Sequence, residues 1–308
     1  MAKKMIFRGA CCALVTPMKS GKIDYEALGA LIERQILGGT EALAVAGTTG
    51  EAPTLKDGER SELFAFVKQK VAGRVKIIFG TGTNDTDEAI RRTKEATRIG
   101  CDAVLVVTPH YNKGTHPGVV EHYERLAALS DTPIILYNVP GRTGVNLTLK
   151  QLEMLAKRES IVGIKEAGDS ADRLTELASF GSELYLYAGC DSQIYEVLAL
   201  GGKGVISVVS NIYPEKISDI CRSYFIGRRR RSLTGQLAIL PFTKLMFAET
   251  NPSPIKYAMS LVGLSSPEVR LPLLPPGQAL MAEISEEVAR LEAERQGFLA
   301  KITTRGEV

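Results

Sequence analysis

Eight short apolar runs recur along the first two thirds of the chain, and segments with helical spacing of apolar residues lie between them. Most of the runs are continuously apolar, which is typical of strands that are buried on both faces of a parallel sheet. The runs begin near Cys11, Ala42, Lys76, Ala103, Ile134, Ile161, Leu184 and Gly204. This alternation predicts an α/β fold made of repeated strand–helix units.

The intervening helices have recognisable start and stop signals. Aspartates at 24, 57, 85 and 191 stand where helices should begin, because a carboxylate accepts hydrogen bonds from the free N–H groups of a first turn. Glycines at 38–39, 73, 100 and 201–202 stand where the same helices should end. Beyond about residue 212 the strand pattern fades and only helical segments follow. We therefore expect a barrel domain over residues 1–225 and a helical domain over 226–308.

Eight strand–helix units favour a closed (β/α)₈ TIM barrel with a C-terminal helical extension. The alternative is an open doubly wound sheet, which the dinucleotide fingerprint G-x-G-x-x-G would support. No match to that fingerprint opens a helix here. Gly80-Thr-Gly82 begins the pattern, which then breaks at Asp85.

The composition excludes several classes of protein. Of 308 residues, 44% are hydrophobic and 24% charged, as in soluble globular proteins rather than disordered ones. A net charge of +3 does not require a polyanionic partner, and the basic run Arg228–Arg231 is interpreted as a solvated helix start, with nucleic-acid contact as the alternative. No apolar run approaches the length of a membrane span or a signal peptide, and the 5 cysteines show no C-x-x-C pair. We expect a cytoplasmic protein without nucleic-acid or membrane partners.

Barrel enzymes work at the carboxyl ends of their strands, which makes Lys165 the sharpest candidate. It ends the run from Ile161, and strand alternation predicts that Ile161, Gly163 and Lys165 share one face. If that face points into the barrel, Gly163 leaves space below the lysine. An amine held in a low-dielectric environment is more often neutral, and a neutral amine can attack a ketone to form a Schiff base. The alternative is a surface lysine or one that pairs with Glu166.

Other rim residues could bind anions or move protons. The loop Gly47–Gly50 can hold an anion through backbone amides, and without the lysine of a P-loop it suits a single carboxylate better than a nucleotide. Tyr137 ends the fifth run and Tyr111 follows the fourth, and a phenol can relay protons when it is hydrogen bonded to a hydroxyl such as that of Thr48. Arg142 has a fork suited to a carboxylate. The alternatives are an ordinary turn, packed tyrosines and a surface salt bridge.

The sequence gives no sign of a metal site or an organic cofactor. His110, His116 and His122 are six residues apart, which is not the spacing of ligands on one helix face, and no cysteine lies near them. No G-x-S-x-G motif is present for a serine hydrolase. We expect neither a metal nor a cofactor.

Seven motifs in order resemble those of the dihydrodipicolinate synthase family of pyruvate-dependent lyases, which are relatives of N-acetylneuraminate lyase. They run in register from about residue 9 to 275. They are Gly47-Thr-Thr-Gly-Glu51, Gly80-Thr-Gly82, Thr108-Pro109 with Tyr111-Asn-Lys113, Tyr137-Asn-Val-Pro-Gly-Arg-Thr-Gly144, Gly163-Ile-Lys-Glu-Ala167, Gly204-Val-Ile-Ser207 and Asn251-Pro-x-Pro-x-Lys256.

The resemblance implies a chemistry and a set of roles. Lys165 would form a Schiff base with pyruvate, whose carboxylate would be held by Thr49 and by the backbone near Thr48 and Ile206. The resulting enamine would attack L-aspartate 4-semialdehyde, in the diaminopimelate route to lysine, without a cofactor.

Further roles follow from the same resemblance. Thr48, Tyr137 and Tyr111 would form the proton relay, with Tyr111 reaching in from a neighbouring subunit of a homotetramer built from tight dimers. Arg142 would bind the carboxylate of the semialdehyde, and Gly189 would line the pocket with its backbone.

Two other functions stay open at this point. An aldolase acting on a sugar acid or hydroxy-oxo acid would share Lys165 and Tyr137 but take another second substrate. A non-catalytic barrel that senses small acids would keep Lys165 charged and unreactive.

Some residues depart from the pattern of family members that lysine inhibits. Asn84 and Glu88 match the inhibitory site. The set that does not match is Ala52, Pro53, Asp57, Arg60 and His110, the last of which stands where many members have a second tyrosine. The sequence therefore predicts weak or absent feedback by lysine.

Overall fold

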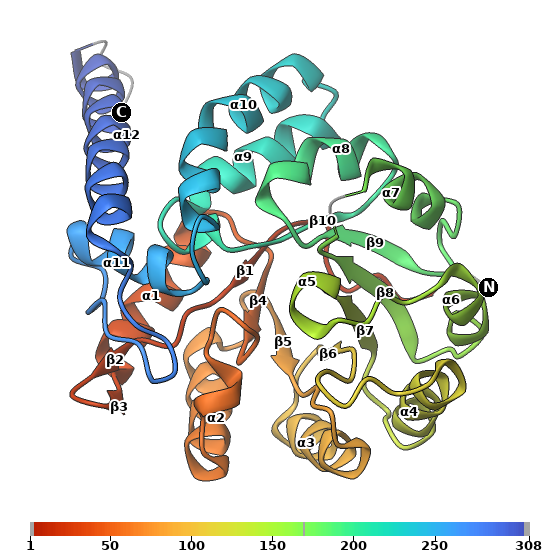
Figure 1. Ribbon diagram of the computed structural model, residues 1–308. Helices are drawn as coiled ribbons and strands as arrows, with labels where there is room; N and C mark the ends of the chain where they lie inside the picture. Colours follow the sequence, from red (N-terminus) through yellow and green to blue (C-terminus); the bar gives the residue numbers. More distant parts are fainter. Residues whose placement is uncertain (1–2, 169, 305–308) are drawn as a thin grey trace.

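Eight parallel strands close into a barrel in the computed structural model, which describes residues 3–168 and 170–304 (Figure 1). Their order around the barrel is β1-β10-β9-β8-β7-β6-β5-β4, and β4 pairs with β1. The strands are β1 (Gly9–Ala13), β4 (Ala42–Val45), β5 (Lys76–Gly80), β6 (Ala103–Val107), β7 (Ile134–Asn138), β8 (Ile161–Glu166), β9 (Tyr185–Ala188) and β10 (Gly204–Ser207). Each coincides with a predicted run, so the closed barrel is confirmed and the open sheet is wrong.

Helices surround the barrel between successive strands (Figure 1). They are α1 (Tyr25–Leu37), α2 (Asp57–Val71), α3 (Thr86–Ile99), α4 (His116–Ala128), α5 (Pro140–Thr143), α6 (Leu149–Leu155), α7 (Ala171–Ala178), α8 (Ile194–Ala199) and α9 (Pro214–Phe225), with short turns η1 (Ala52–Thr54), η2 (Asp191–Gln193) and η3 (Val209–Asn211). A small hairpin of β2 (Met18–Lys19) and β3 (Lys22–Ile23), which the sequence did not predict, follows β1.

The C-terminal part is helical, as predicted. It consists of α10 (Arg229–Met246), α11 (Ser253–Leu261) and α12 (Gln278–Thr304). Figure 1 shows α12 to one side of the barrel, beside α11. The domain boundary at 225/226 stays a prediction. No helix in the described part of the chain is long and apolar enough to cross a membrane.

Two of the four predicted helix caps are confirmed and two are wrong. Asp24 accepts a hydrogen bond from the Ala27 amide, and Asp85 accepts one from the Glu88 amide, each at 3.0 Å. Asp57 is the first residue of α2, and the capping position is occupied by Lys56. Asp191 instead turns its buried carboxylate toward the end of β10. It accepts hydrogen bonds there from the Ser207 hydroxyl and the Val208 amide, because the chain after β10 leaves those donors without helix partners.

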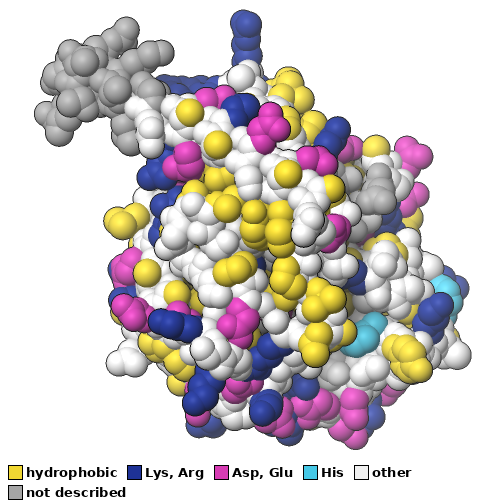
Figure 2. Space-filling view, turned by 60° about the vertical axis from the view of Figure 1, so that its left-hand side comes forward, with side chains coloured by type: hydrophobic (Ala, Val, Ile, Leu, Met, Phe, Trp, Pro, Cys, Tyr) yellow, Lys and Arg dark blue, Asp and Glu magenta, His cyan; other side chains and the backbone are white. Residues whose placement is uncertain are grey.

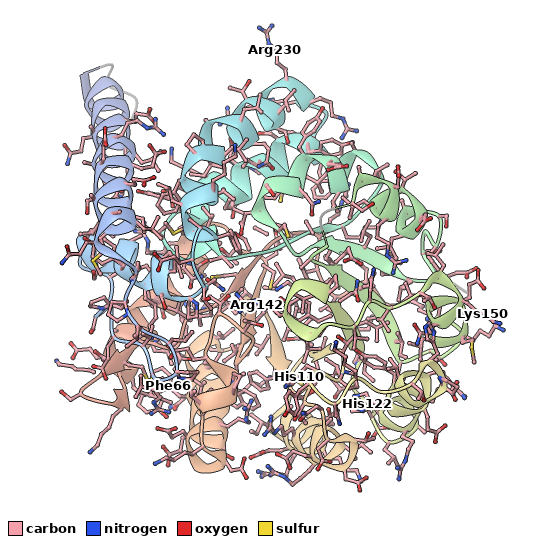
Figure 3. All side chains as sticks on the ribbon, viewed as in Figure 1. Phe66, His110, His122, Arg142, Lys150 and Arg230 are labelled. Atoms are coloured by element: carbon pink, nitrogen blue, oxygen red, sulfur yellow. The ribbon has the colours of Figure 1, made fainter. Side chains whose placement is uncertain are left out.

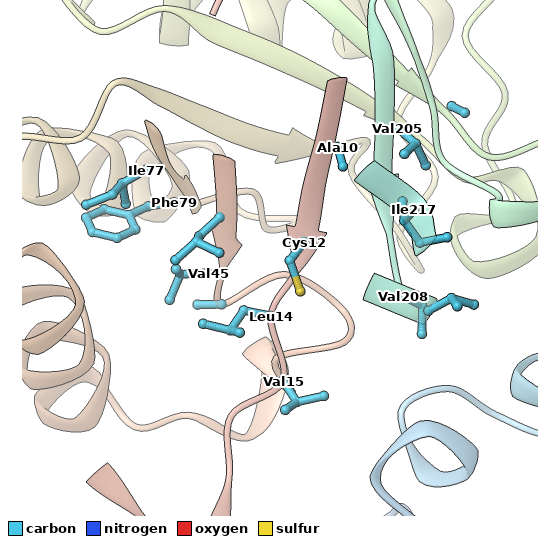
Figure 4. Packing of buried hydrophobic residues seen from close by; sticks show 14 of the residues in the cluster. Ala10, Cys12, Leu14, Val15, Val45, Ile77, Phe79, Val205, Val208 and Ile217 are labelled. Carbon is cyan, nitrogen blue, oxygen red and sulfur yellow. The ribbon is translucent and has the colours of Figure 1, made fainter. Parts of the chain in front are cut away.

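The apolar core has two layers. The larger layer packs the outer faces of the strands against the helices, and Figure 4 shows part of it, from Ile77 and Phe79 to Val205 and Ile217. The smaller layer lies inside the barrel and is closed below by Phe7. The Phe7 ring stacks on Tyr187 with 4.4 Å between centroids, and the Tyr187 hydroxyl donates to the Phe7 carbonyl at 3.0 Å. These two rings form an aromatic floor under the rim.

A bulge in β8 changes the face of the strand on which Ile161 lies. Ile134 of β7 pairs with Ile161, but Ile135 pairs with Gly163, so one extra residue lies on β8. Ile161 consequently packs in the outer layer and Val162 in the inner one, and the prediction that Ile161 shares the face of Lys165 is wrong.

The space below Lys165 is filled rather than open. A Cβ atom on Gly163 would lie 2.8 Å from the Tyr185 carbonyl oxygen and 3.2 Å from Cε2 of Tyr187. Gly163 therefore admits the Tyr187 ring of the aromatic floor, and the predicted vacancy does not exist.

The burial of His122 on α4 predicts that the stability of the fold depends on pH. The ring is 3% exposed, and its Nδ1 shares a hydrogen bond of 2.9 Å with the Thr86 hydroxyl. Burial lowers the pKa of His122 from 6.5 to about 4, against the opposing charge of Asp85. The folded state thus favours the neutral ring, and this stabilisation is complete above the unfolded pKa and lost as the pH falls through 6.5 toward 4. Its full size is about 3 kcal/mol.

We expect His122→Phe to flatten the fall of Tm between pH 7 and pH 4. The exposed His116 at the start of the same helix provides the control, since His116→Ala should leave the pH dependence of Tm as in the wild type. Parallel Tm curves for wild type and His122→Phe would contradict this explanation.

Candidate active site

Two cavities of about 400 Å³ each open at the carboxyl ends of the strands. Both are lined by Thr48, Tyr137, Val139 and Arg142. The first, termed the Lys165 cavity, also contains Lys165, Thr49, Ala167, Gly189, Cys190, Ser192, Val208, Thr243, Lys244, Phe247 and Asn251. The second, termed the His110 cavity, also contains Ala46, Gly47, Ala52, Pro53, Gly80, Gly82, Thr83, Arg92, Leu105, Val107, His110 and Thr143. Figure 3 shows Arg142 near the middle of this rim.

Lys165 is buried, and no carboxylate in the described part of the chain forms an ion pair with it. Its side chain is 6% exposed, and Nζ lies 4.2 Å from the centroid of the Tyr137 ring. The register of β7 and β8 causes this proximity, because Tyr137 pairs directly with Lys165. Within the described residues, Lys165 forms no hydrogen bond and no ion pair. The alternative in which Lys165 pairs with Glu166 is therefore wrong.

Glu166 faces away from the cavity and ties the ends of two strands together. The Asn138 amide nitrogen donates to both Glu166 oxygens at 2.9 and 3.0 Å, and the Gly168 amide donates to one of them at 2.9 Å. Burial raises the pKa of Glu166 against these hydrogen bonds. Asn138 also accepts a hydrogen bond from the Leu147 amide at 3.0 Å, which anchors the segment that follows β7. The hydrogen-bonded pair of Asn138 and Glu166 thus holds in place the preceding pair on the same two strands, Tyr137 and Lys165.

The threonine loop after β4 lines the Lys165 cavity with Thr48 and Thr49. The amides of Gly50 and Glu51 donate within the turn to the carbonyls of Gly47 and Thr48. The amides of Thr48 and Thr49 have no acceptor among the described residues. Free N–H groups of this kind suit a carboxylate, and carboxylate binding by this loop stays a prediction.

A segment of the helical domain fastens this loop from the other side. The Asn251 side-chain nitrogen donates to Thr49 Oγ1 at 2.9 Å, and the Asn251 carbonyl accepts from Arg142 at 3.2 Å. Sequence reasoning noted Asn251 within a motif but gave it no role. The signal available was an asparagine before a Pro-x-Pro segment, which does not say what it contacts.

A buried ion pair lies behind the same loop. Lys256 Nζ is 2.5 Å from Glu51 Oε1, and both side chains are 0% exposed. The other Glu51 oxygen accepts from the Arg270 amide at 2.9 Å. Burial lowers the pKa of Lys256, and Glu51 opposes that shift. Lys256 is thus a structural lysine with a carboxylate partner, in contrast to Lys165.

Some of the remaining predicted site residues line a cavity and others do not. Gly189 lines the Lys165 cavity, and a Cβ there would lie 2.6 Å from the Glu166 carbonyl oxygen, so only glycine fits. Ile206 is fully buried in the inner layer and lines neither cavity. Tyr111 is 89% exposed with a φ of 70°, and it lines neither cavity of its own chain. Thr48 and Tyr137 share both cavities, although their hydroxyls are not bonded to each other within the described chain.

The charged side chains of the surface are spread over the molecule. On the face seen in Figure 2, acidic and basic side chains are interspersed rather than segregated. Arg231 pairs with Asp219, and Arg229 stacks on the Tyr224 ring at 3.4 Å, as expected for a solvated helix start. Across the described ranges, no group of three His, Cys, Asp or Glu side chains could hold a metal ion.

The closed barrel with cavities at its carboxyl rim is the architecture of a (β/α)₈-barrel enzyme. The model of the Dihydrodipicolinate synthetase family matches residues 6–291, and the chain belongs to that family. A 4-hydroxy-tetrahydrodipicolinate synthase from Alkaliphilus oremlandii is 42% identical over 295 residues, which is 96% of this chain and 100% of that protein.

Solved structures agree with this assignment. The crystal structure of dihydrodipicolinate synthase from Thermotoga maritima has a TM-score of 0.91 and 38% identity, covering 94% of this chain and 99% of that one. A monomeric dihydrodipicolinate synthase variant has a TM-score of 0.90 and 38% identity, covering 92% and 96%.

Proposed function

We propose that this chain is a 4-hydroxy-tetrahydrodipicolinate synthase, which condenses pyruvate with L-aspartate 4-semialdehyde in the diaminopimelate route to lysine in the cytoplasm. The observation that carries the proposal is the buried Lys165 amine, which forms no hydrogen bond or ion pair with the described residues and faces a cavity with Tyr137 and Arg142 on its walls.

The first half of the reaction fixes pyruvate to the protein. The amides of Thr48 and Thr49 and the Thr49 hydroxyl bind the pyruvate carboxylate. The Lys165 nitrogen attacks the keto carbon, and the former keto oxygen leaves as water to give a Schiff base. Because the protonated Schiff base draws electrons, the pyruvate methyl group loses a proton and an enamine forms.

The second half builds the new carbon–carbon bond. The enamine carbon attacks the aldehyde, and Tyr137 gives the proton that turns the aldehyde oxygen into a hydroxyl. The amine of the second substrate then displaces Lys165 and closes a six-membered ring. Arg142 binds the carboxylate of the semialdehyde through its guanidinium fork, while Gly189 leaves room beside it.

The proton relay requires a second copy of the chain. Tyr111 is exposed at a positive φ and lines neither rim cavity of its own chain, which supports its entry into a neighbouring site beside Thr48 and Tyr137. We infer a homotetramer built from two tight dimers. Sedimentation velocity of the wild type should show the tetramer, and a monomer with full activity would contradict the shared relay.

Borohydride reduction tests the proposed chemistry. In the presence of pyruvate, the peptide that contains Lys165 should gain the mass of a reduced pyruvyl group, and a non-catalytic binder would show no such adduct. Turnover with L-aspartate 4-semialdehyde then distinguishes the synthase from an aldolase, which would trap pyruvate but not consume the semialdehyde.

Glu88 beside the His110 cavity bears on regulation by lysine. Arg91 donates to both Glu88 oxygens at 2.6 and 2.8 Å, and Arg92 donates to one of them at 2.6 Å. The hydrogen bonds from Arg91, followed by those from Arg92, lower the pKa of Glu88 to about 2. An incoming lysine amine would have to displace these guanidinium groups.

We therefore expect millimolar L-lysine to leave the rate unchanged at saturating pyruvate. The measurement is a coupled assay with increasing lysine, with arginine added as the matched cationic control. Selective inhibition by lysine would contradict the prediction.

A further inference from the structure

Asn251 is buried at the junction of the barrel and the helical domain. It lies between α10 and α11, is 4% exposed and lines the Lys165 cavity. It contacts two residues that bind carboxylates in the proposed function, through its side chain to Thr49 and through its backbone carbonyl to Arg142. One residue of the helical domain thus touches both anion subsites of the barrel.

Asn251 is the donor and Thr49 the acceptor in the hydrogen bond between their side chains. A threonine hydroxyl carries one hydrogen and two acceptor positions. The Asn251 amide nitrogen donates to Thr49 Oγ1 and fills an acceptor position, so the hydroxyl hydrogen must point elsewhere. The Thr49 hydroxyl donates to no group in the described chain. Its hydrogen is therefore available to a ligand in the cavity.

The burial of Asn251 favours this orientation of its amide. The Asn251 oxygen Oδ1 is buried and has no hydrogen-bond partner. The reversed amide would place the nitrogen, with its N–H donors, in that partnerless position. An orphaned buried N–H group is rarer in proteins than an under-satisfied carbonyl oxygen. The amide is thus held with its nitrogen toward Thr49.

We propose that Asn251 is a positioning residue that commits the Thr49 hydroxyl hydrogen to the carboxylate of the keto acid. This inference rests on the proposed function, because it requires a carboxylate to be bound beside Lys165. Its side chain acts on the keto-acid subsite alone, since the contact with Arg142 is made by the backbone and survives substitution.

Steady-state kinetics with both substrates tests the proposal. Asn251→Ala should raise the KM for pyruvate roughly three- to tenfold, as expected for one neutral hydrogen bond, with a much smaller change in kcat and in the KM for the semialdehyde. Asn251→Asp is isosteric and should retain the fold. Because its carboxylate accepts the Thr49 hydrogen and repels the keto acid, its KM for pyruvate should rise about 100-fold.

A double-mutant cycle identifies the route of the effect. Thr49→Val removes the hydroxyl at nearly constant volume. If Asn251 acts through Thr49, Asn251→Ala should change the KM for pyruvate by less than about twofold in the Thr49→Val background. Independent, multiplying effects of the two substitutions would overturn the proposal.

A matched control separates positioning from structural support. Tyr257→Phe removes another hydrogen bond of the helical domain, the one of 3.1 Å between Tyr257 and Ser285, and should leave the KM for pyruvate unchanged. If both Asn251 variants lower Tm but bind pyruvate as the wild type does, Asn251 is only structural and the inference fails. Failure of the proposed function looks different, because the wild type itself would then trap no pyruvate under borohydride.

Discussion

Lys165→Ala should reduce turnover by at least about 10³-fold and abolish pyruvate trapping under borohydride. The loss is this large because the amine is the group that becomes bonded to the substrate. The cavity that remains can still bind a keto acid through the threonine loop, but it cannot turn the methyl carbon into a nucleophile. Turnover in the coupled assay and the mass of the trapped peptide are the two measurements.

Two further variants make this result specific. Lys165→Arg keeps a positive charge but offers no amine for condensation, so it should be as inactive as Lys165→Ala. Lys150 lies exposed at the periphery on α6 (Figure 3), and Lys150→Ala should retain wild-type turnover. Full activity of Lys165→Ala, or a pyruvyl adduct on another lysine, would refute the proposed mechanism.

Lys256→Met should destabilise the protein by about 3–5 kcal/mol, because it leaves the Glu51 carboxylate buried without a cation. The corresponding fall in Tm is roughly 5–10 °C. Since Glu51 lies immediately after the threonine loop, we also expect weaker pyruvate binding by the variant that remains folded. Thermal unfolding and the KM for pyruvate measure the two effects.

The double variant Glu51→Gln/Lys256→Met is the matched control. Glutamine keeps an acceptor for the Arg270 amide but carries no charge, so the double variant should recover most of the stability lost in Lys256→Met. If the double variant is less stable than Lys256→Met alone, the unpaired charge is not the cause of the loss.

The sequence predicted those parts of the molecule that depend on local patterns. Eight continuously apolar runs indicated strands buried on both faces, and the barrel followed from their number. Lys165 and Tyr137 could be placed at one rim because each ends such a run and parallel strands share a carboxyl edge. That the two are direct partners depends on register, which the sequence pattern alone does not specify.

Features that depend on long-range contacts were missed or misread. The bulge in β8 changes the face to which the Ile161 side chain points, and no residue type in that strand indicates a bulge. Gly163 indicated a lack of side-chain volume, but only the fold shows that Tyr187 fills it. The role proposed for Asn251 depends on a hydrogen bond to Thr49, which is 202 residues away in the chain.

The aromatic floor made by Phe7 and Tyr187 has a consequence for the order of events. Because these stacked rings lie under the Lys165 cavity, the reactants and the product of the proposed reaction enter and leave at the rim. In the proposed reaction, the keto acid binds first, at the bottom of the cavity, and the aldehyde binds above it. The cyclised product leaves before the next keto acid binds. This arrangement imposes an ordered binding of the two substrates. The two rings also keep bulk water from reaching the Lys165 nitrogen from the floor of the barrel.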